Sequence, residues 1–389
     1  MNKVDWTMKR IYLDYNATTP LDESVLDAMH PFLKDACGNP ASIHQFGQEA
    51  GAAVEEARKN LSRLIGASPR EIYFTSGATE SDNWAILGYA RANEHKGRHI
   101  VTSSVEHPAV NAPCDLLEEQ GFNVTRLPVD GDGMVDPGEF EKALRPDTVM
   151  ATIMHANNEV GSIQPVEDLS GLARAKGVMF HTDAAQSVGK VPVDVEALGV
   201  GLLSLSAHKF YGPKGVGALY VKKGTRMDPL IVGGGQERGY RAGTLNVPGI
   251  VGLGRAALVA GARVTEDAAM LARLRDWLQD AIPSRLDGIT VNGRGKRLPG
   301  TLNVSVAGVQ GPDLMVALDL EGIAVSAGAA CHSGAAEPSP VLLAMGVSEE
   351  AAINSIRISL GRHTTRGDLE VLVDVLPQAV RRARGERLR

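Results

Sequence analysis

Two polar clusters that follow short apolar runs contain the residues best suited to chemistry. The first cluster, His-Thr-Asp-Ala-Ala-Gln, follows Phe180 and contains Asp183 and Gln186. The second, Ala-His-Lys, follows the apolar run at residues 202–206 and contains Lys209. A lysine amine shielded from water loses proton affinity and becomes a nucleophile, as Schiff-base chemistry requires. A structural ion pair between Asp183 and Lys209 would explain the same residues, and these two clusters alone do not separate the interpretations.

Both apolar runs predict buried strands of one parallel sheet. Neither residues 177–180 nor residues 202–206 alternate between apolar and polar side chains, which is typical of strands covered on both faces. Ligands bind at the carboxyl ends of such strands, so we expect the two clusters to meet in one crevice. Strand and helix patterns alternate through residues 70–220, which predicts an α/β fold with a doubly wound, mostly parallel sheet.

Length and composition limit the class of protein. The 389 residues suit two domains better than one core. A formal net charge of -6 argues against nucleic acid or an anionic membrane surface as the main partner. We see no apolar run of the roughly 20 residues that a membrane span needs and no signal-peptide pattern, so we expect a cytoplasmic protein. The three cysteines form no CxxC pair, which fits a reducing compartment and predicts no metal site.

The pattern of predicted helices and strands changes towards the C-terminal end of the chain. After residue 260 a long helix pattern leads into the strand pattern PGTLNVSV. This change predicts a large domain at residues 21–260 and a smaller α+β domain at residues 261–389, joined by the N-terminal segment 1–20. SIRISLGR alternates between apolar and polar residues, which predicts a half-exposed strand. The glycine-rich residues 232–244 predict a mobile loop.

Five motifs in chain order resemble those of the class V aminotransferase branch of fold-type I pyridoxal phosphate (PLP) enzymes. They are FTSGATES, MHANNEVG, HTDAAQ, SAHKFYGPKG and RAGT. More narrowly, the set is similar to that of cysteine desulfurases of the NifS/IscS type, from YLDYNATTP near the start to SIRISLGRHTT near the end. The resemblance implies PLP fold type I, a homodimer and removal of sulfur from L-cysteine.

The resemblance also implies the site residues. Lys209 binds the PLP aldehyde, Asp183 meets the pyridine nitrogen, and His107 stacks on the ring and can shuttle protons. The turn in FTSGATES precedes a helix N-terminus, which suits a phosphate, although an ordinary capped helix is the alternative. The other residues implied for PLP are Ala78, Thr79, Asn158, Gln186, Ser206, His208 and, across the dimer, Thr244. Those implied for the substrate are Asn16, Asn39, Asn158 and Arg357, whose guanidinium suits a carboxylate.

Cys331 decides the predicted reaction. It lies in AVSAGAACHSGAAEPSP, whose small side chains predict a mobile segment, although an ordinary loop cysteine is the alternative. The resemblance implies that Cys331 takes the sulfur as a persulfide, releases L-alanine, and passes the sulfur to an acceptor protein of iron–sulfur cluster assembly or tRNA thiolation. The family segment usually reads Ser-Gly-Ser-Ala-Cys-Thr-Ser, whereas here Ala327 and Ala329 replace two hydroxyl residues and His332 replaces the threonine. Either His107 or His332 is a candidate to activate the thiol.

Two other functions remain open from the sequence. The first is a selenocysteine lyase or another PLP β-lyase, in which Cys331 is dispensable. The second is a weakly active assembly protein that mainly binds a sulfur-acceptor scaffold. A plain aminotransferase does not need a thiol on a mobile segment, so Cys331 favours the desulfurase.

Overall fold

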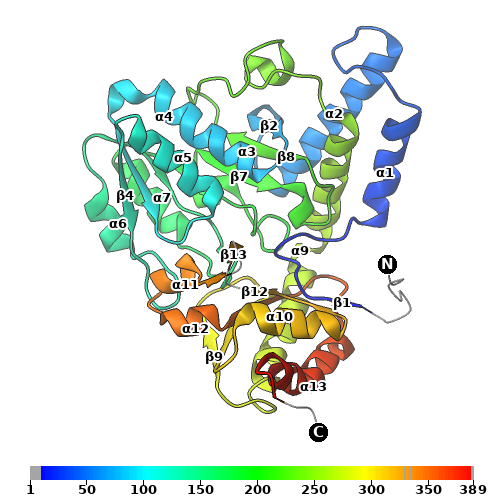
Figure 1. Ribbon diagram of the computed structural model, residues 1–389. Coiled ribbons are helices and arrows are strands. Elements are labelled where there is room, and N and C mark those ends of the chain that lie inside the picture. The colour runs from blue at the N-terminus through cyan, green and yellow to red at the C-terminus, as the bar shows by residue number, and fades with distance from the viewer. Residues whose placement is uncertain (1–9, 328–329, 333–334, 387–389) are drawn as a thin grey trace.

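A computed structural model describes residues 10–327, 330–332 and 335–386. Its largest sheet has the strand order β2-β8-β7-β6-β5-β3-β4 (Figure 1). Neighbours from β4 to β7 are parallel, and β8 runs antiparallel to both β7 and β2. The mostly parallel sheet is therefore confirmed. The strands are β2 (Ile72–Thr75), β3 (His99–Ser103), β4 (Asn123–Leu127), β5 (Thr148–Thr152), β6 (Met179–Asp183), β7 (Leu202–Ser206) and β8 (Gly217–Val221).

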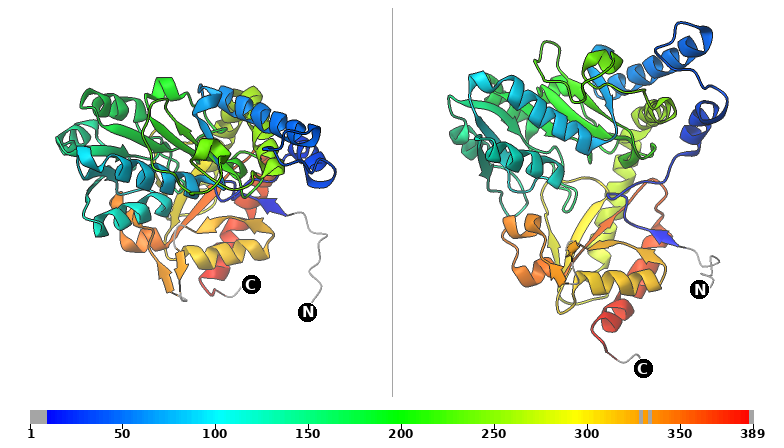
Figure 2. Two further views of the ribbon diagram at one scale, coloured as in Figure 1. Left: turned by 90° about the horizontal axis from the view of Figure 1, so that it is seen from above. Right: turned by 45° about the horizontal axis from the view of Figure 1, so that its top comes forward.

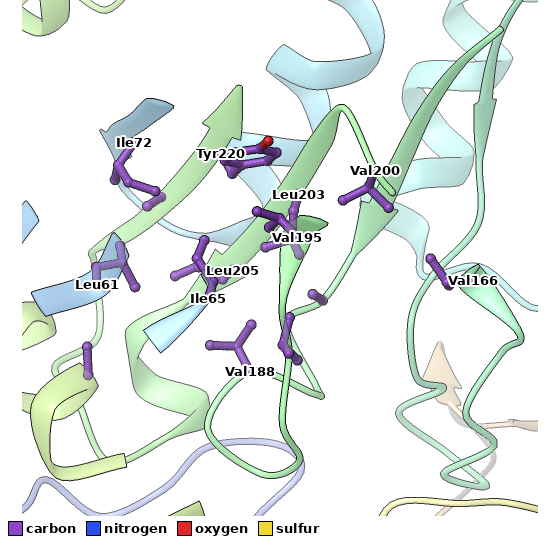
Figure 3. Packing of buried hydrophobic residues seen from close by; sticks show 14 of the residues in the cluster. Leu61, Ile65, Ile72, Val166, Val188, Val195, Val200, Leu203, Leu205 and Tyr220 are labelled. Carbon is purple, nitrogen blue, oxygen red and sulfur yellow. The ribbon is translucent and has the colours of Figure 1, made fainter. Parts of the chain in front are cut away.

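Helices cover both faces of this sheet. Leu203 and Leu205 of β7 belong to a core that includes Leu61 and Ile65 from the end of α2, as Figure 3 shows. Leu202 points to the other face and belongs to a core with residues of α5. Two-sided burial explains why the strand sequences do not alternate. The helices are α1 (Glu23–Lys34), α2 (Gln45–Leu64), α3 (Ala78–Asn83), α4 (Tyr89–Ala92), α5 (Pro108–Glu119), α6 (Pro137–Ala143), α7 (Val166–Ala175) and α8 (Val195–Leu198).

A second, antiparallel sheet has the strand order β12-β15-β10-β9. Its strands and the long helices α10 and α13 form a separate core. The N-terminal strand β1 (Ile11–Tyr12) pairs in parallel with β11 (Ile323–Ala324), so the start of the chain packs with this half of the molecule. The remaining elements are β9 (Ile289–Asn292), β10 (Thr301–Val306), α10 (Gly311–Leu320), β12 (Ser326–Ala327), β13 (Ala330–His332), β14 (Ala335–Glu337), α11 (Pro340–Ala344), α12 (Glu349–Ile353), β15 (Ser355–Ser359) and α13 (Arg366–Ala383).

Helix α9 (Val247–Ala281) connects the two halves, as the right view of Figure 2 shows. Its residues up to Ala260 pack in the core of the large sheet, whereas Leu271 and Leu278 pack in the second core. The predicted boundary at 260/261 thus falls inside one continuous helix, and the division into domains stays a prediction. Contrary to expectation, α9 is long and apolar enough to cross a membrane, although its buried positions identify it as a core helix of this fold.

Two predictions of local structure are corrected. Strand β15 is buried along its whole length rather than half-exposed, because Arg357 contacts Asn158 of the large-sheet half while Ile356 and Ile358 face the second core. The glycine-rich residues 232–244 contain a turn that is held in place. Glu237 there is buried and forms an ion pair of 2.7 Å with Arg58 of α2.

Candidate active site

A cavity of about 530 Å³ opens at the carboxyl ends of β6 and β7. It collects most of the residues that the sequence predicted for the site. Those that line it are Ala78, Thr79, His107, Asn158, Asp183, Gln186, Ser206, His208 and Lys209. The strands end at this edge because Asp183 and Ser206 each close a fully buried strand, and turn residues follow.

Lys209 lies in the helical turn after β7 and is half-buried. Its Nζ donates to the backbone oxygens of Asn16 (2.7 Å) and Ala17 (3.0 Å). Burial, and next the positive charge of Arg357, lower the pKa of Lys209 to about 8, although Asp183 acts in the opposite direction. No carboxylate of the described residues forms an ion pair with this amine. The structural ion pair between Asp183 and Lys209, the alternative open from the sequence, is therefore not seen among the described residues.

Asp183 and His107 lie in the same cavity. Asp183 is buried and accepts a hydrogen bond of 2.9 Å from the backbone N–H of Ala185. Burial raises the pKa of Asp183, and the charges of His107 and Lys209 oppose that rise. His107 is the N-cap residue of α5, and its Nδ1 accepts from the backbone N–H of Ala109 at 3.1 Å. Burial lowers the pKa of His107, so the ring is neutral near pH 7 and its Nε2 carries the proton.

A network of hydrogen bonds links the cavity to the half of the molecule that contains the second sheet. Asn16 Nδ2 donates to the backbone oxygen of Asn158 at 3.1 Å, and Arg357 Nη1 donates to the same oxygen at 3.0 Å. Arg357 also forms an ion pair of 2.6 Å with Asp14, while its Nε is buried without a partner. Gln186 Nε2 donates to the backbone oxygen of Asn16 at 2.9 Å. The guanidinium therefore keeps one buried donor for a further acceptor.

Two predicted residues, Asn39 and Thr244, lie away from this cavity, whereas Asn16 and Arg357 border it through the hydrogen bonds above without lining it. Asn39 is exposed and lines a second cavity, and its side chain accepts from the backbone N–H of Ala41. Thr244 is exposed and lies outside the cavity. Cys331 lies on β13, opposite Ala336 of β14, and its side chain is outside the described residues. The predicted irregular segment thus contains a short hairpin.

Comparison with known proteins agrees with this geometry. A family profile described as "Aminotransferase class-V" matches residues 11–372. The chain belongs to the class V aminotransferase family. A curated relative named "Cysteine desulfurase IscS", from Dictyoglomus turgidum, is 52% identical over 97% of this chain and 96% of its own length.

Solved structures extend the similarity to the fold. One titled "NIFS-LIKE PROTEIN" has a TM-score of 0.90 and 42% identity, covering 95% of this chain and 99% of the other. One titled "SspA in complex with cysteine" has a TM-score of 0.81 and 38% identity, covering 92% of this chain and 100% of the other. The family resemblance and the fold class predicted from the motifs, PLP fold type I, are both confirmed.

The residues present fit the PLP on which class V aminotransferases depend. The first turn of α3 has no side-chain cap, so its N–H groups are available to a phosphate beside Ser206 and His208. The turn is also close-packed, because a Cβ on Gly217 would lie 2.7 Å from Gly77 Cα. Burial and nearby lysines lower the pKa of His208 to about 4, so the ring is neutral and able to donate a hydrogen bond.

The sequence reasoning missed several polar residues around the site. Lys190 Nζ donates to Gln186 Oε1 (2.8 Å) and Asn16 Oδ1 (2.9 Å), and so fixes two predicted residues. Its position four residues after Gln186 was the available signal. Asp82 lines the cavity from α3, and the buried Glu106 joins the ends of β3 and β5 through Ser103 Oγ and the N–H of Met154. Among the described residues, no group of three His, Cys, Asp or Glu side chains is arranged to hold a metal ion.

Proposed function

We propose that this chain is a PLP-dependent cysteine desulfurase, which takes sulfur from L-cysteine, releases L-alanine and carries the sulfur as a persulfide on Cys331. The observation that carries the proposal is the shared cavity of Lys209 and Asp183, in which burial prepares the lysine as a nucleophile. Full-length similarity to proteins named cysteine desulfurase confirms the reaction predicted from the motifs.

Bound PLP would supply an electron sink that weakens the bonds at the substrate's α-carbon. The chain supplies the remaining groups. Lys209 would hold the cofactor and afterwards move a proton at the α-carbon, because with a pKa of about 8 roughly a tenth of the amine is neutral at pH 7. Asp183 would hold a proton at the ring nitrogen. Ser206, His208 and the first turn of α3 would hold the phosphate.

The substrate carboxylate has a candidate partner in Arg357. Its Nε is buried and has no acceptor, and a buried unpaired donor is costly, so an incoming carboxylate oxygen would satisfy it. Asn16 and Asn158 hold the guanidinium side of the pocket in place through the shared backbone oxygen. The structure titled "SspA in complex with cysteine" supports cysteine as the class of substrate.

Cys331 is proposed as the sulfur acceptor on the chain. Its thiolate would attack the substrate sulfur, forming an S–S bond while the C–S bond breaks and alanine leaves. The activating group stays open between His107, whose neutral ring faces the cavity, and His332, whose side chain is outside the described residues. The persulfide would then pass to an acceptor protein of iron–sulfur cluster assembly or tRNA thiolation, and affinity capture of the persulfidated protein would identify it.

We also propose a homodimer, in which Thr244 reaches the partner's phosphate site and Asn39 lies near the interface. Three large apolar side chains on the segments around both residues are exposed, and contact with a partner would remove them from water. They are Ile43 (91% exposed), Phe46 (61%) and Val232 (88%). Light scattering of the purified protein tests this, and a monomer at micromolar concentration would contradict it. We place the enzyme in the cytoplasm, with large and small domains meeting near residue 260.

The proposed reaction is tested with purified protein and L-cysteine. We expect alanine and sulfur in equal amounts and a mass increase of one sulfur on the peptide that contains Cys331. Lys209→Ala should lose the PLP absorbance band and the activity, whereas Lys142→Ala, at an exposed lysine, should keep both. Cys331→Ala, without added thiol, should lose the persulfide. Alanine production by Cys331→Ala at the wild-type rate, or stronger use of selenocysteine in competition, would contradict the proposal.

A further inference from the structure

Asp82 is a buried carboxyl group for which the proposed reaction has no use. It lies on α3, lines the same cavity as Lys209 and Asp183, and has no exposed surface. Neither of its side-chain oxygens has a hydrogen-bond partner in good geometry among the described residues, although the Ser204 hydroxyl lies close enough to stabilise the ionised form in part. An ionised carboxylate in this position would be an unpaired charge in a medium of low dielectric constant, which is strongly unfavourable.

The nearest basic group does not supply a positive charge. His181 Nε2 lies 3.6 Å from Asp82 Oδ1, but His181 is itself fully buried. Its ring nitrogens already contact the hydroxyls of Thr152 (2.8 Å) and Ser204 (3.0 Å). Burial lowers the pKa of His181 to about 3, so the ring stays neutral. A neutral ring cannot balance a carboxylate.

The other titratable groups around Asp82 are also unable to balance its charge. Burial raises the pKa of Asp82 well above its ordinary value, the buried carboxyls Asp183 on β6 and Glu106 after β3 add to the rise, and the Ser204 hydroxyl opposes it only in part. His107, at the start of the neighbouring α5, is neutral near pH 7 because burial lowers its pKa. No Lys or Arg in the described part of the chain forms an ion pair with Asp82, although Lys209 lines the same cavity.

We propose that Asp82 is a positioning residue that remains a neutral carboxylic acid, and that it thereby leaves Asp183 as the carboxylate available to the PLP ring. Two neighbouring buried carboxyls share one proton more readily than they both ionise. A proton on Asp82 frees Asp183 to accept from a protonated ring nitrogen, whereas an ionised Asp82 would force Asp183 to keep the proton. This consequence rests on the proposed function, but the protonation of Asp82 does not.

The proposal fixes the sign of a pH effect. In the unfolded chain Asp82 ionises in the ordinary acidic range, whereas the folded protein holds its proton to higher pH. The folded state is therefore penalised as pH rises above the unfolded value, until Asp82 itself ionises. Asp82→Asn keeps the shape, cannot ionise, and removes that penalty. We expect its melting temperature to gain on wild type by on the order of 2 °C for each pH unit above the ordinary aspartate range, for as long as Asp82 in the wild type keeps its proton.

Infrared difference spectroscopy of the full-length protein without PLP tests the protonation directly. The spectrum of wild type minus Asp82→Asn at pH 7 should show the carbonyl band of a protonated carboxyl group. The matched control is Asp267→Asn, because Asp267 is largely buried but accepts hydrogen bonds from Arg362 (2.9 Å) and Arg263 (3.2 Å). That variant should show carboxylate bands instead, and its melting temperature should fall at pH 7.

The outcomes separate the inference from the proposed function. Carboxylate bands for Asp82, or a melting difference that is constant with pH, would overturn the inference even if Lys209→Ala loses PLP as proposed. With PLP bound, Asp82→Asn should keep its cofactor absorbance at pH 7 and retain it to higher pH than wild type. A cofactor titration that is unchanged by Asp82→Asn would overturn the link between Asp82 and Asp183.

Discussion

Removal of Glu237 should destabilise the protein more than the loss of any surface ion pair. Glu237 is 1% exposed at its side chain and holds Arg58, which is 5% exposed, through contacts of 2.7 and 3.0 Å. It also accepts from the backbone N–H of Phe74 at 2.7 Å. Burial alone would lower the pKa of Arg58, but contact with Glu237 raises it, so the guanidinium stays charged. Glu237→Leu therefore leaves a buried cation and a buried N–H without their main acceptor.

The size of the effect follows from these contacts. Breaking a buried ion pair by removing one partner costs about 3–5 kcal/mol, and an orphaned buried N–H costs about 1–3 kcal/mol. Arg58 keeps two contacts, with Glu55 and the backbone oxygen of Ile72, which reduces the first cost. Glu237 also has a positive φ of 44°, and relaxation of that strain reduces the cost further. We expect a net loss of about 4 kcal/mol.

Urea unfolding of the protein without PLP measures this loss without a contribution from cofactor release. The double variant Arg58→Met, Glu237→Leu should regain about 2–3 kcal/mol relative to Glu237→Leu, because no charge is left buried. Glu370→Leu is the control: it breaks an exposed pair with Arg366 of 3.0 Å and should cost less than about 0.5 kcal/mol. A loss below about 1 kcal/mol for Glu237→Leu, or a double variant no more stable than the single one, would refute the reasoning.

Three further predictions concern the site and the thiols. Arg357→Gln removes a positive charge that lowers the pKa of Lys209, so less of the amine is neutral at pH 7. The apoprotein should therefore take up PLP several-fold more slowly at pH 7, and the pH profile of uptake should move to higher pH. An unchanged profile would count against this electrostatic effect. A thiol reagent followed by peptide mapping should label the exposed Cys37 in the folded protein but reach Cys114 only after unfolding. Cys114 is buried, and burial raises its pKa to about 12. Equal labelling of both cysteines in the folded state would contradict this. Gly217→Ala should weaken PLP binding about tenfold or more in equilibrium titration, because the added methyl group would press against the backbone of the turn before α3. An affinity equal to that of wild type would contradict this and show that the turn can move to accommodate the methyl group.

The parts of the fold with regular burial could be predicted from sequence. The run at residues 202–206 became β7 with the same bounds, because a strand buried on both faces is mostly apolar and does not alternate. The same rule failed for β15, whose alternation suggested water on one face. That face is instead covered, because Arg357 contacts Asn158 of the large-sheet half and Asp14 of the N-terminal segment. A periodic pattern reports polarity along a strand, but it does not report which distant segment covers the polar face.

The same limit applies inside the site. Lys209 and Asp183 could be predicted because Asp183 ends β6 and Lys209 lies in the turn that follows β7, where the chain itself fixes the position. Asp82 could not, since its role depends on groups that only folding brings near it, and for Lys190 the spacing from Gln186 was a signal but the contact with Asn16 was not. Glu237 shows the effect most clearly, because glycines around it predicted mobility while one carboxylate holds the turn.

Substrate recognition should depend on both halves of the molecule at once. Arg357 comes from the second sheet, its ion-pair partner Asp14 from the N-terminal segment, and the Asn158 backbone oxygen from the large-sheet half. Asn16 donates to the same Asn158 oxygen through its side chain, and its own backbone oxygen accepts from Lys209 Nζ. Asn16 therefore connects that oxygen to the reactive amine. A carboxylate that occupied the free Arg357 Nε would therefore act on a group already connected to the reactive amine. By lessening the charge that lowers the Lys209 pKa, a bound carboxylate would raise it and prepare the amine to take up a proton.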